Sequence, residues 1–180
     1  MYPFIRLAKE LLLTRRMPKL PILGTHVSHH ICWPWDIDFW AELNNGRTLT
    51  IYDLGRIPLA SRVGLLRALK EKGWGLSVAG VSVRYRRRVR PFERIRINSR
   101  CVGWDDRFIY LEQTIWKKNG ECANQALYRA AATDASGIAN PDGLLVLMGW
   151  DGPRPVLPEW VQNWISADAT RPWPPADTAA

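Results

Sequence analysis

The chain has 180 residues, 47% hydrophobic and 23% charged, which excludes a disordered chain and favours one globular domain with a sizeable core. Its net charge of +8 favours an anionic partner or substrate; nucleic acid, an anionic membrane and the phosphates of coenzyme A all qualify. The three cysteines, Cys32, Cys101 and Cys122, form no CxxC pair, which disfavours a zinc site and a disulfide framework. We therefore expect buried free thiols, no metal and a reduced, cytoplasmic setting.

Residues 1–22 are predicted to form an N-terminal extension with an amphipathic helix over residues 1–16, ended by Pro18 and Pro21. The apolar residues that recur at helical spacing are Phe4, Leu7, Ala8 and Leu11. The run is too short and too interrupted to span a membrane. A basic amphipathic helix can lie on an anionic membrane, but packing on its own domain or on a partner subunit is favoured here.

A strand is predicted over residues 25–33, and it carries all three histidines of the chain. His29 and His30 are adjacent, so they point to opposite faces of the strand. Because no acid stands at helical spacing from a histidine pair, structural or surface histidines are favoured over a metal site.

The central helix is predicted from Asn45 to about Leu59. Asn44 and Asn45 are suited to cap its first turn, where asparagine side chains accept hydrogen bonds from free backbone N–H groups. Pro58 is expected to break or kink the run. A second helical piece follows over residues 60–72 and is closed by a glycine.

Four further strands are predicted over residues 76–85, 94–100, 108–116 and 121–133. Tight turns at residues 105–107 and 118–120 join them as consecutive hairpins, so the sheet is expected to be mostly antiparallel.

A dense run of arginines follows the first of these four strands. If the strand continues through the run, alternation places Arg84, Arg86, Arg88 and Arg90 on one face and Arg87 on the other. Guanidinium groups match phosphate oxygens, so some of these residues are candidates for holding the phosphates of a substrate. An ordinary solvated sheet face is the alternative for any single arginine.

Residues 137–180 are predicted to form a proline-rich C-terminal extension without the strand pattern. A short amphipathic helix is predicted over residues 158–167. The last ten or so residues are expected to be poorly ordered.

A motif precedes the central helix, and it consists of Asp36, Asp38, Ala41, Glu42, Asn44 and Asn45. It resembles the Asp-x-Asp-x-x-Gly-His-x-Asn-Asn signature of hotdog-fold acyl-CoA thioesterases related to 4-hydroxybenzoyl-CoA thioesterase. The spacing matches without a gap, although Ala41 replaces the glycine and Glu42 replaces the histidine. The resemblance implies an α+β hotdog domain over residues 23–136, in which a curved antiparallel sheet wraps around the central helix. It also implies a homodimer or homotetramer, because hotdog sites of this kind form between subunits.

The resemblance implies hydrolysis of an acyl-CoA thioester without a cofactor. Asp38 matches the catalytic carboxylate, which acts as nucleophile or as base for water. Asn45 is the second candidate at the catalytic centre, and backbone amides at the helix start are expected to hold the oxyanion. The candidates for substrate binding are Asn44, Glu42, Arg84, Arg86 and Arg88. Asp36 is more simply a structural hydrogen-bond partner.

Two other functions remain open. The first is a hotdog protein that binds acyl-CoA or a partner without turnover, favoured by Glu42 in place of the histidine. The second is a nucleic-acid binder, suggested by the arginine run and by ten tryptophans but not favoured. The absence of a Gly-x-Ser-x-Gly sequence disfavours an α/β-hydrolase. A hotdog dehydratase needs a catalytic histidine, and no histidine follows Asp38.

Overall fold

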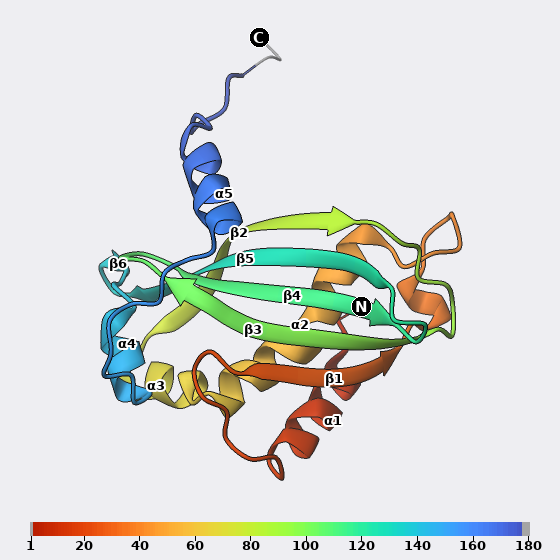
Figure 1. The fold of residues 1–180 in the computed structure, drawn as a ribbon, viewed down its shortest axis with the longest axis horizontal. Helices are drawn as coiled ribbons and strands as arrows, with labels where there is room; N and C mark the ends of the chain where they lie inside the picture. The colour runs from red at the N-terminus through yellow and green to blue at the C-terminus, as the bar shows by residue number, and fades with distance from the viewer. Residues whose placement is uncertain (1, 178–180) are drawn as a thin grey trace.

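A computed structural model describes residues 2–177, and it shows a curved antiparallel sheet that crosses in front of a long helix, α2 (Figure 1). The strand order is β1-β3-β4-β5-β2, with β6 paired to β5. The strands are β1 (Thr25–Ile31), β2 (Gly75–Tyr85), β3 (Arg94–Trp104), β4 (Ile109–Lys117), β5 (Cys122–Asp134) and β6 (Gly137–Ile138). The fold is therefore α+β and has the hotdog layout that the sequence predicts.

Helix α2 (Asn45–Arg62) fills the hollow of the sheet. Its buried Ile51, Tyr52 and Leu54 belong to the same core as the inward-facing residues of β3 and β4. Gly55 permits the close approach, since a Cβ atom there would lie 2.5 Å from the Ser99 hydroxyl oxygen. Ser99 also accepts a hydrogen bond from the Gln113 side chain, which donates a second one to the backbone oxygen of Tyr52.

Pro58 was expected to break or kink the helix, and a break is wrong, because α2 continues through this buried proline to Arg62. The chain turns instead at Gly64, whose φ of 85° lies in the left-handed region that favours glycine. Helix α3 (Leu65–Lys72) follows and ends at Gly73, also left-handed with φ 67°, as its sequence predicts.

Helix α1 (Phe4–Thr14) forms where expected, but it does not pack on the predicted apolar face. Leu7 packs against the core, whereas Phe4 and Ala8 are exposed. The residues turned inward are Glu10 and Thr14, together with Arg6. Polar partners on the domain explain this orientation, because Arg6 forms an ion pair with the buried Asp36.

The C-terminal residues hold more structure than the sequence indicates. A short helix, α4 (Asp142–Leu147), buries Leu144 and Leu145 in the core, and its six residues give too little periodicity to be predicted. The predicted helix is present as α5 (Glu159–Ala169), and its Val161 packs on a small second core with Tyr110 and Leu127. The predicted disorder of the last ten or so residues includes residues 178–180, which lie outside the described residues.

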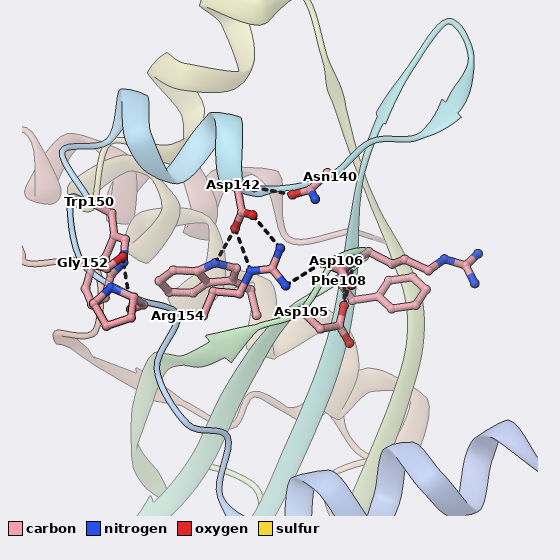
Figure 2. Close-up of polar contacts among 11 residues, drawn as sticks. Asp105, Asp106, Phe108, Asn140, Asp142, Trp150, Gly152 and Arg154 are labelled. Atoms are coloured by element: carbon pink, nitrogen blue, oxygen red, sulfur yellow. Dashed lines mark hydrogen bonds and ion pairs between the residues drawn. The ribbon is translucent and has the colours of Figure 1, made fainter.

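A cluster of ion pairs fixes the chain between α4 and α5 (Figure 2). Asp142 accepts hydrogen bonds from the Arg154 guanidinium at 2.5 and 3.0 Å and from the Trp104 indole at 3.0 Å. Arg154 also pairs with Asp106 of the β3–β4 turn at 2.6 Å. The segment that leads to α5 is thus bound to the end of the sheet.

Candidate functional site

The loop between β1 and α2 carries the motif, and it is not a continuation of the strand. Strand β1 ends at Ile31, and a 3-10 helix, η1 (Pro34–Asp36), follows. A continued strand would have placed Asp36 and Asp38 on one face, but Pro34 begins a helical turn instead. The loop then closes tightly: the Asp38 N–H donates to the Glu42 oxygen at 2.8 Å, and the Ala41 N–H donates to the Asp38 oxygen at 3.0 Å.

Asp36 is the structural centre of this loop. Its carboxylate is buried and accepts hydrogen bonds at 2.7 Å from both Arg6 of α1 and Arg47 of α2. It also accepts one from the Trp33 N–H at 3.1 Å. Two arginines balance the buried charge, which joins α1, the loop and the start of α2. This agrees with the structural role expected for Asp36.

Asp38 lies in the tight turn, two residues further on, and its side chain is half-buried. Its Oδ1 atom accepts a hydrogen bond from the Trp40 N–H at 2.9 Å. The neighbouring aromatic side chains of Phe39 and Trp40 are exposed and contact each other edge to face. The turn therefore presents a carboxylate beside an apolar surface.

The N-terminus of α2 follows the turn directly. Asn44 is the N-cap residue, and its side-chain oxygen accepts a hydrogen bond from the Arg47 N–H at 2.9 Å, as predicted. Asn45 is the first helical residue rather than a cap, and its backbone oxygen accepts a hydrogen bond from the Tyr85 hydroxyl at 3.0 Å. The helix start carries partial positive charge, which favours an anion or a developing oxyanion nearby.

An open cavity of about 160 Å³ lies beside this helix start. Its lining includes Glu42, Asn45, Thr48, Tyr85, Arg86 and Arg88. The structure thus brings four predicted site residues together: Glu42, Asn45, Arg86 and Arg88. Asp38 and Asn44 lie next to them in the chain but do not line the cavity.

The predicted alternation of the arginine run is wrong, because β2 ends at Tyr85. The N–H groups of Arg86 and Arg87 both donate to the Ala123 oxygen, which ends regular pairing with β5. Arg84 precedes Tyr85 within the strand and so points to the opposite face. The structure therefore separates Arg84 from the cavity that Arg86 and Arg88 line.

Glu42 occupies the position of the motif histidine. It is not fully exposed to solvent, and its negative charge is balanced by an arginine. Its carboxylate is half-buried and pairs with the Arg88 guanidinium at 2.9 Å. One predicted phosphate-binding arginine is thus engaged by the residue that departs from the motif.

The histidines lie away from the cavity. Burial and the nearby Arg62 lower the pKa of His26 to about 4, and burial and neighbouring cations lower the pKa of His30 to about 3. Both side chains are therefore neutral near pH 7 and serve as uncharged core residues, whereas His29 is exposed. Among residues 2–177 no group of three or more histidine, cysteine, aspartate or glutamate side chains is placed to hold a metal ion.

Two larger hollows contain none of the predicted site residues. One, of about 780 Å³, lies beside α1 at the edge formed by β1. The other, of about 840 Å³, lies between α5 and the outer face of the sheet. Size alone does not identify a site, and the smaller cavity is the candidate because the motif residue Glu42 and the first residue of α2, Asn45, line it.

Sequence reasoning missed Tyr85 and Thr48, both of which line the cavity. Burial raises the pKa of Tyr85, so its hydroxyl remains a hydrogen-bond donor at neutral pH. A signal was available, since Tyr85 is the last residue of an alternating strand and directly precedes the arginine run. Nothing in the sequence shows that this strand end meets the start of α2.

Comparison with known proteins shows the family of this chain. The model of the Thioesterase-like superfamily matches residues 32–165, and the chain belongs to this family. It is 30% identical to "Protein THEM6" of Drosophila melanogaster over 152 residues, 83% of this chain and 76% of that protein. It is 37% identical to "Protein THEM6" of Xenopus laevis over 111 residues, 61% of this chain, and spans only 54% of that relative.

Solved structures share the fold at low sequence identity. The YbaW probable thioesterase from Escherichia coli superposes with a TM-score of 0.64 at 17% identity, over 68% of this chain and 95% of that one. The Staphylococcus aureus protein SAV2348, solved in complex with CoA, superposes with a TM-score of 0.59 at 13% identity, over 79% of this chain and 95% of that one. No helix within residues 2–177 is long and apolar enough to cross a membrane.

Proposed function

We propose that this protein hydrolyses an acyl-CoA thioester with the carboxylate of Asp38. The observation that carries the proposal is the position of Asp38, in a tight turn immediately before the capped N-terminus of α2, at the motif spacing. Either the carboxylate attacks the thioester carbon and expels the CoA thiolate, and water then hydrolyses the acyl–Asp38 anhydride, or the carboxylate removes a proton from a water that attacks this carbon and displaces the thiolate. Backbone N–H groups of the first turn of α2 would stabilise the oxyanion in both cases.

The basic rim of the cavity supports a CoA substrate. Arg86 and Arg88 line it, and guanidinium groups bind phosphate oxygens well. SAV2348, which shares the fold, was solved with CoA bound. We expect the acyl chain to lie toward the exposed aromatic residues of the turn, Phe39 and Trp40.

The site is expected to be completed by a second subunit. Strand β2 pairs with β5 along one edge, and among the described residues no strand pairs with its other edge. Leu76, Val78 and Val81 of this strand are exposed, which is unusual for a strand that stays unpaired. A homodimer joined at β2 satisfies the open edge. A cytoplasmic location and the absence of nucleic-acid binding stay predictions.

The test is thiol release from a panel of acyl-CoAs, short, long and aromatic, with wild-type protein and Asp38→Asn. Asparagine cannot serve as the base or carboxylate nucleophile, so we expect kcat/KM to fall by about 100-fold or more. Asp151→Asn, at an exposed aspartate in the C-terminal extension, is the matched control and should leave turnover unchanged. Equal turnover in wild type and Asp38→Asn would refute the assignment of Asp38.

A second function, acyl-CoA binding without turnover, is favoured by the ion pair between Glu42 and Arg88. Glu42 stands at the histidine position of the motif, and it pairs with Arg88, which lines the cavity. The same panel separates the two functions when it is combined with equilibrium binding. Folded protein that binds acyl-CoA and releases no thiol would establish the binding function.

A further inference from the structure

Helix α1 turns its polar side toward the domain. Glu10 and Thr14 are buried, and the Thr14 hydroxyl donates to the Glu10 backbone oxygen at 2.9 Å. Arg6 pairs with Asp36 at 2.7 Å and donates a hydrogen bond to the Ile31 backbone oxygen at 3.2 Å, and the Glu10 carboxylate lies 3.8 Å from the His30 ring. These contacts of Arg6 and Glu10 with the domain fix the rotation of the helix about its axis, so the domain itself sets which side faces outward.

The outward side carries four large apolar residues, with the exposed Lys9 among them. Phe4, Ile5, Leu12 and Leu13 form what we call the outer apolar face, with exposed fractions of 70, 87, 59 and 46%. Ile5 and Leu12 are seven residues apart and therefore lie on one side of the helix, two turns apart. Single exposed apolar residues are ordinary, but several on one helix face indicate an interaction surface.

The charges around the outer apolar face indicate which kind of partner can bind it. Residues 2–24 contain five cations and one acid, and the acid, Glu10, is buried in the domain. The exposed cations are Lys9, Arg15, Arg16 and Lys19. A second copy of the same face would bring these positive charges together, which disfavours self-association through α1. The occupant must combine an apolar interior with an anionic surface.

We propose that α1 docks this protein onto the surface of an anionic phospholipid bilayer. The outer apolar face would enter the boundary between headgroups and acyl chains, and the flanking cations would contact the lipid phosphates and carboxylates. The eleven residues of α1 suffice for a helix that lies in the plane of the interface. The attachment needs no spanning segment and leaves the sheet and the cavity outside the lipid.

The test is co-sedimentation of the full chain with vesicles of phosphatidylcholine alone and of phosphatidylcholine and phosphatidylserine in equal parts. We expect binding to the mixed vesicles, little binding to the neutral ones, and release by added salt. The double variant Ile5→Ser/Leu12→Ser should lower the affinity by about tenfold or more, because it removes buried apolar area. Val146→Ser/Val156→Ser, also at exposed apolar positions, is the matched control and should bind as wild type does.

A second pair of variants tests the charge. Arg15→Glu/Arg16→Glu should abolish the preference for phosphatidylserine, whereas Arg67→Glu/Lys70→Glu on α3 makes the same charge change away from α1 and should preserve it. All four positions are exposed, so each protein is expected to fold, and far-UV circular dichroism checks this.

Two outcomes overturn the proposal. One is wild-type protein that stays in the supernatant with both kinds of vesicle. The other is vesicle binding that Ile5→Ser/Leu12→Ser leaves unchanged. If that variant instead lowers the mass measured by analytical ultracentrifugation and wild type ignores vesicles, the outer apolar face is a subunit interface.

Discussion

Ala41 adopts a backbone conformation that its side chain disfavours. Its φ of 55° lies in the left-handed region, where a Cβ atom crowds the following carbonyl oxygen. The position closes the turn that holds Asp38, and the resembling motif has glycine there. The left-handed φ gives a physical reason for the glycine of the motif, and we expect alanine to cost stability at this position.

We predict that Ala41→Gly raises the free energy of unfolding by about 1 kcal/mol, because glycine removes the left-handed strain while adding some freedom to the unfolded chain. Urea denaturation measures the change. Ala8→Gly, at an exposed right-handed position of α1, is the control and should lower stability by roughly 0.5–1 kcal/mol. A loss of stability in Ala41→Gly would show that the turn is not strained.

At the scale of elements, the approach of α2 to the sheet depends on one missing side chain. A Cβ atom on Gly55 would meet the Ser99 hydroxyl at 2.5 Å and an Ile97 methyl at 3.0 Å. Ser99 is itself held by a hydrogen bond from Gln113 at 2.7 Å, so it cannot move without breaking that contact. This contact sets how closely the middle of α2 approaches the sheet, while the Asp36–Arg47 ion pair holds its N-terminus.

Gly55→Ala is therefore expected to destabilise the protein by roughly 1–3 kcal/mol, although alanine is the better helix former. Thermal and urea unfolding report the change. The control is Gly143→Ala, also at a helical position. Its new methyl group would lie 3.9 Å from the nearest atom, the Lys72 amine nitrogen, so this variant should be as stable as the wild type or more stable by up to about 1 kcal/mol. A neutral Gly55→Ala would mean that α2 has room to shift outward.

The elements with a strong repeating pattern were predictable from the sequence, and those set by contacts were not. The strands alternate and the Asn44 cap is local, so both are found from neighbouring residues alone. The rotation of α1 is set by Asp36, a residue distant in the chain, and no pattern within the helix reveals that partner. The end of β2 is likewise set by the Ala123 backbone oxygen, which accepts hydrogen bonds from two successive N–H groups.

At the scale of the molecule, the open edge of β2 is the feature that favours assembly. Its unpaired backbone groups and exposed apolar side chains suit pairing with a second strand. We predict that the wild-type protein sediments as a dimer or tetramer of 20.6 kDa chains, and that Val78→Lys/Val81→Lys shifts it to monomers. Lysines on an edge strand oppose pairing because they are charged and strongly solvated.

Sedimentation velocity measures this, and Val156→Lys, at a position 89% exposed in the C-terminal extension, is the control that should leave assembly unchanged. A monomeric wild type would remove the proposed dimer. If Val78→Lys/Val81→Lys stays fully assembled, the subunits meet at another surface.

The part of the candidate site that is local in the sequence was predictable, and the part formed by distant residues was not. Asp38, Asn44 and Asn45 lie within a few residues of one another, so the sequence alone places them together. Arg86 and Arg88 were selected for their charge, and only the fold shows that they line a cavity with Asn45 while Arg84 does not. Tyr85 was missed because its role depends on the meeting of β2 and α2.

The ion pairs of Asp36 have a practical consequence for protein engineering. Residues 1–22 look like a removable leader, and a shortened protein would be an obvious choice for crystallisation or assay. Their removal would take away Arg6 and leave a buried carboxylate, two residues from Asp38, with one arginine fewer. Low activity in such a shortened protein would then reflect a damaged loop, so assays belong with the whole chain.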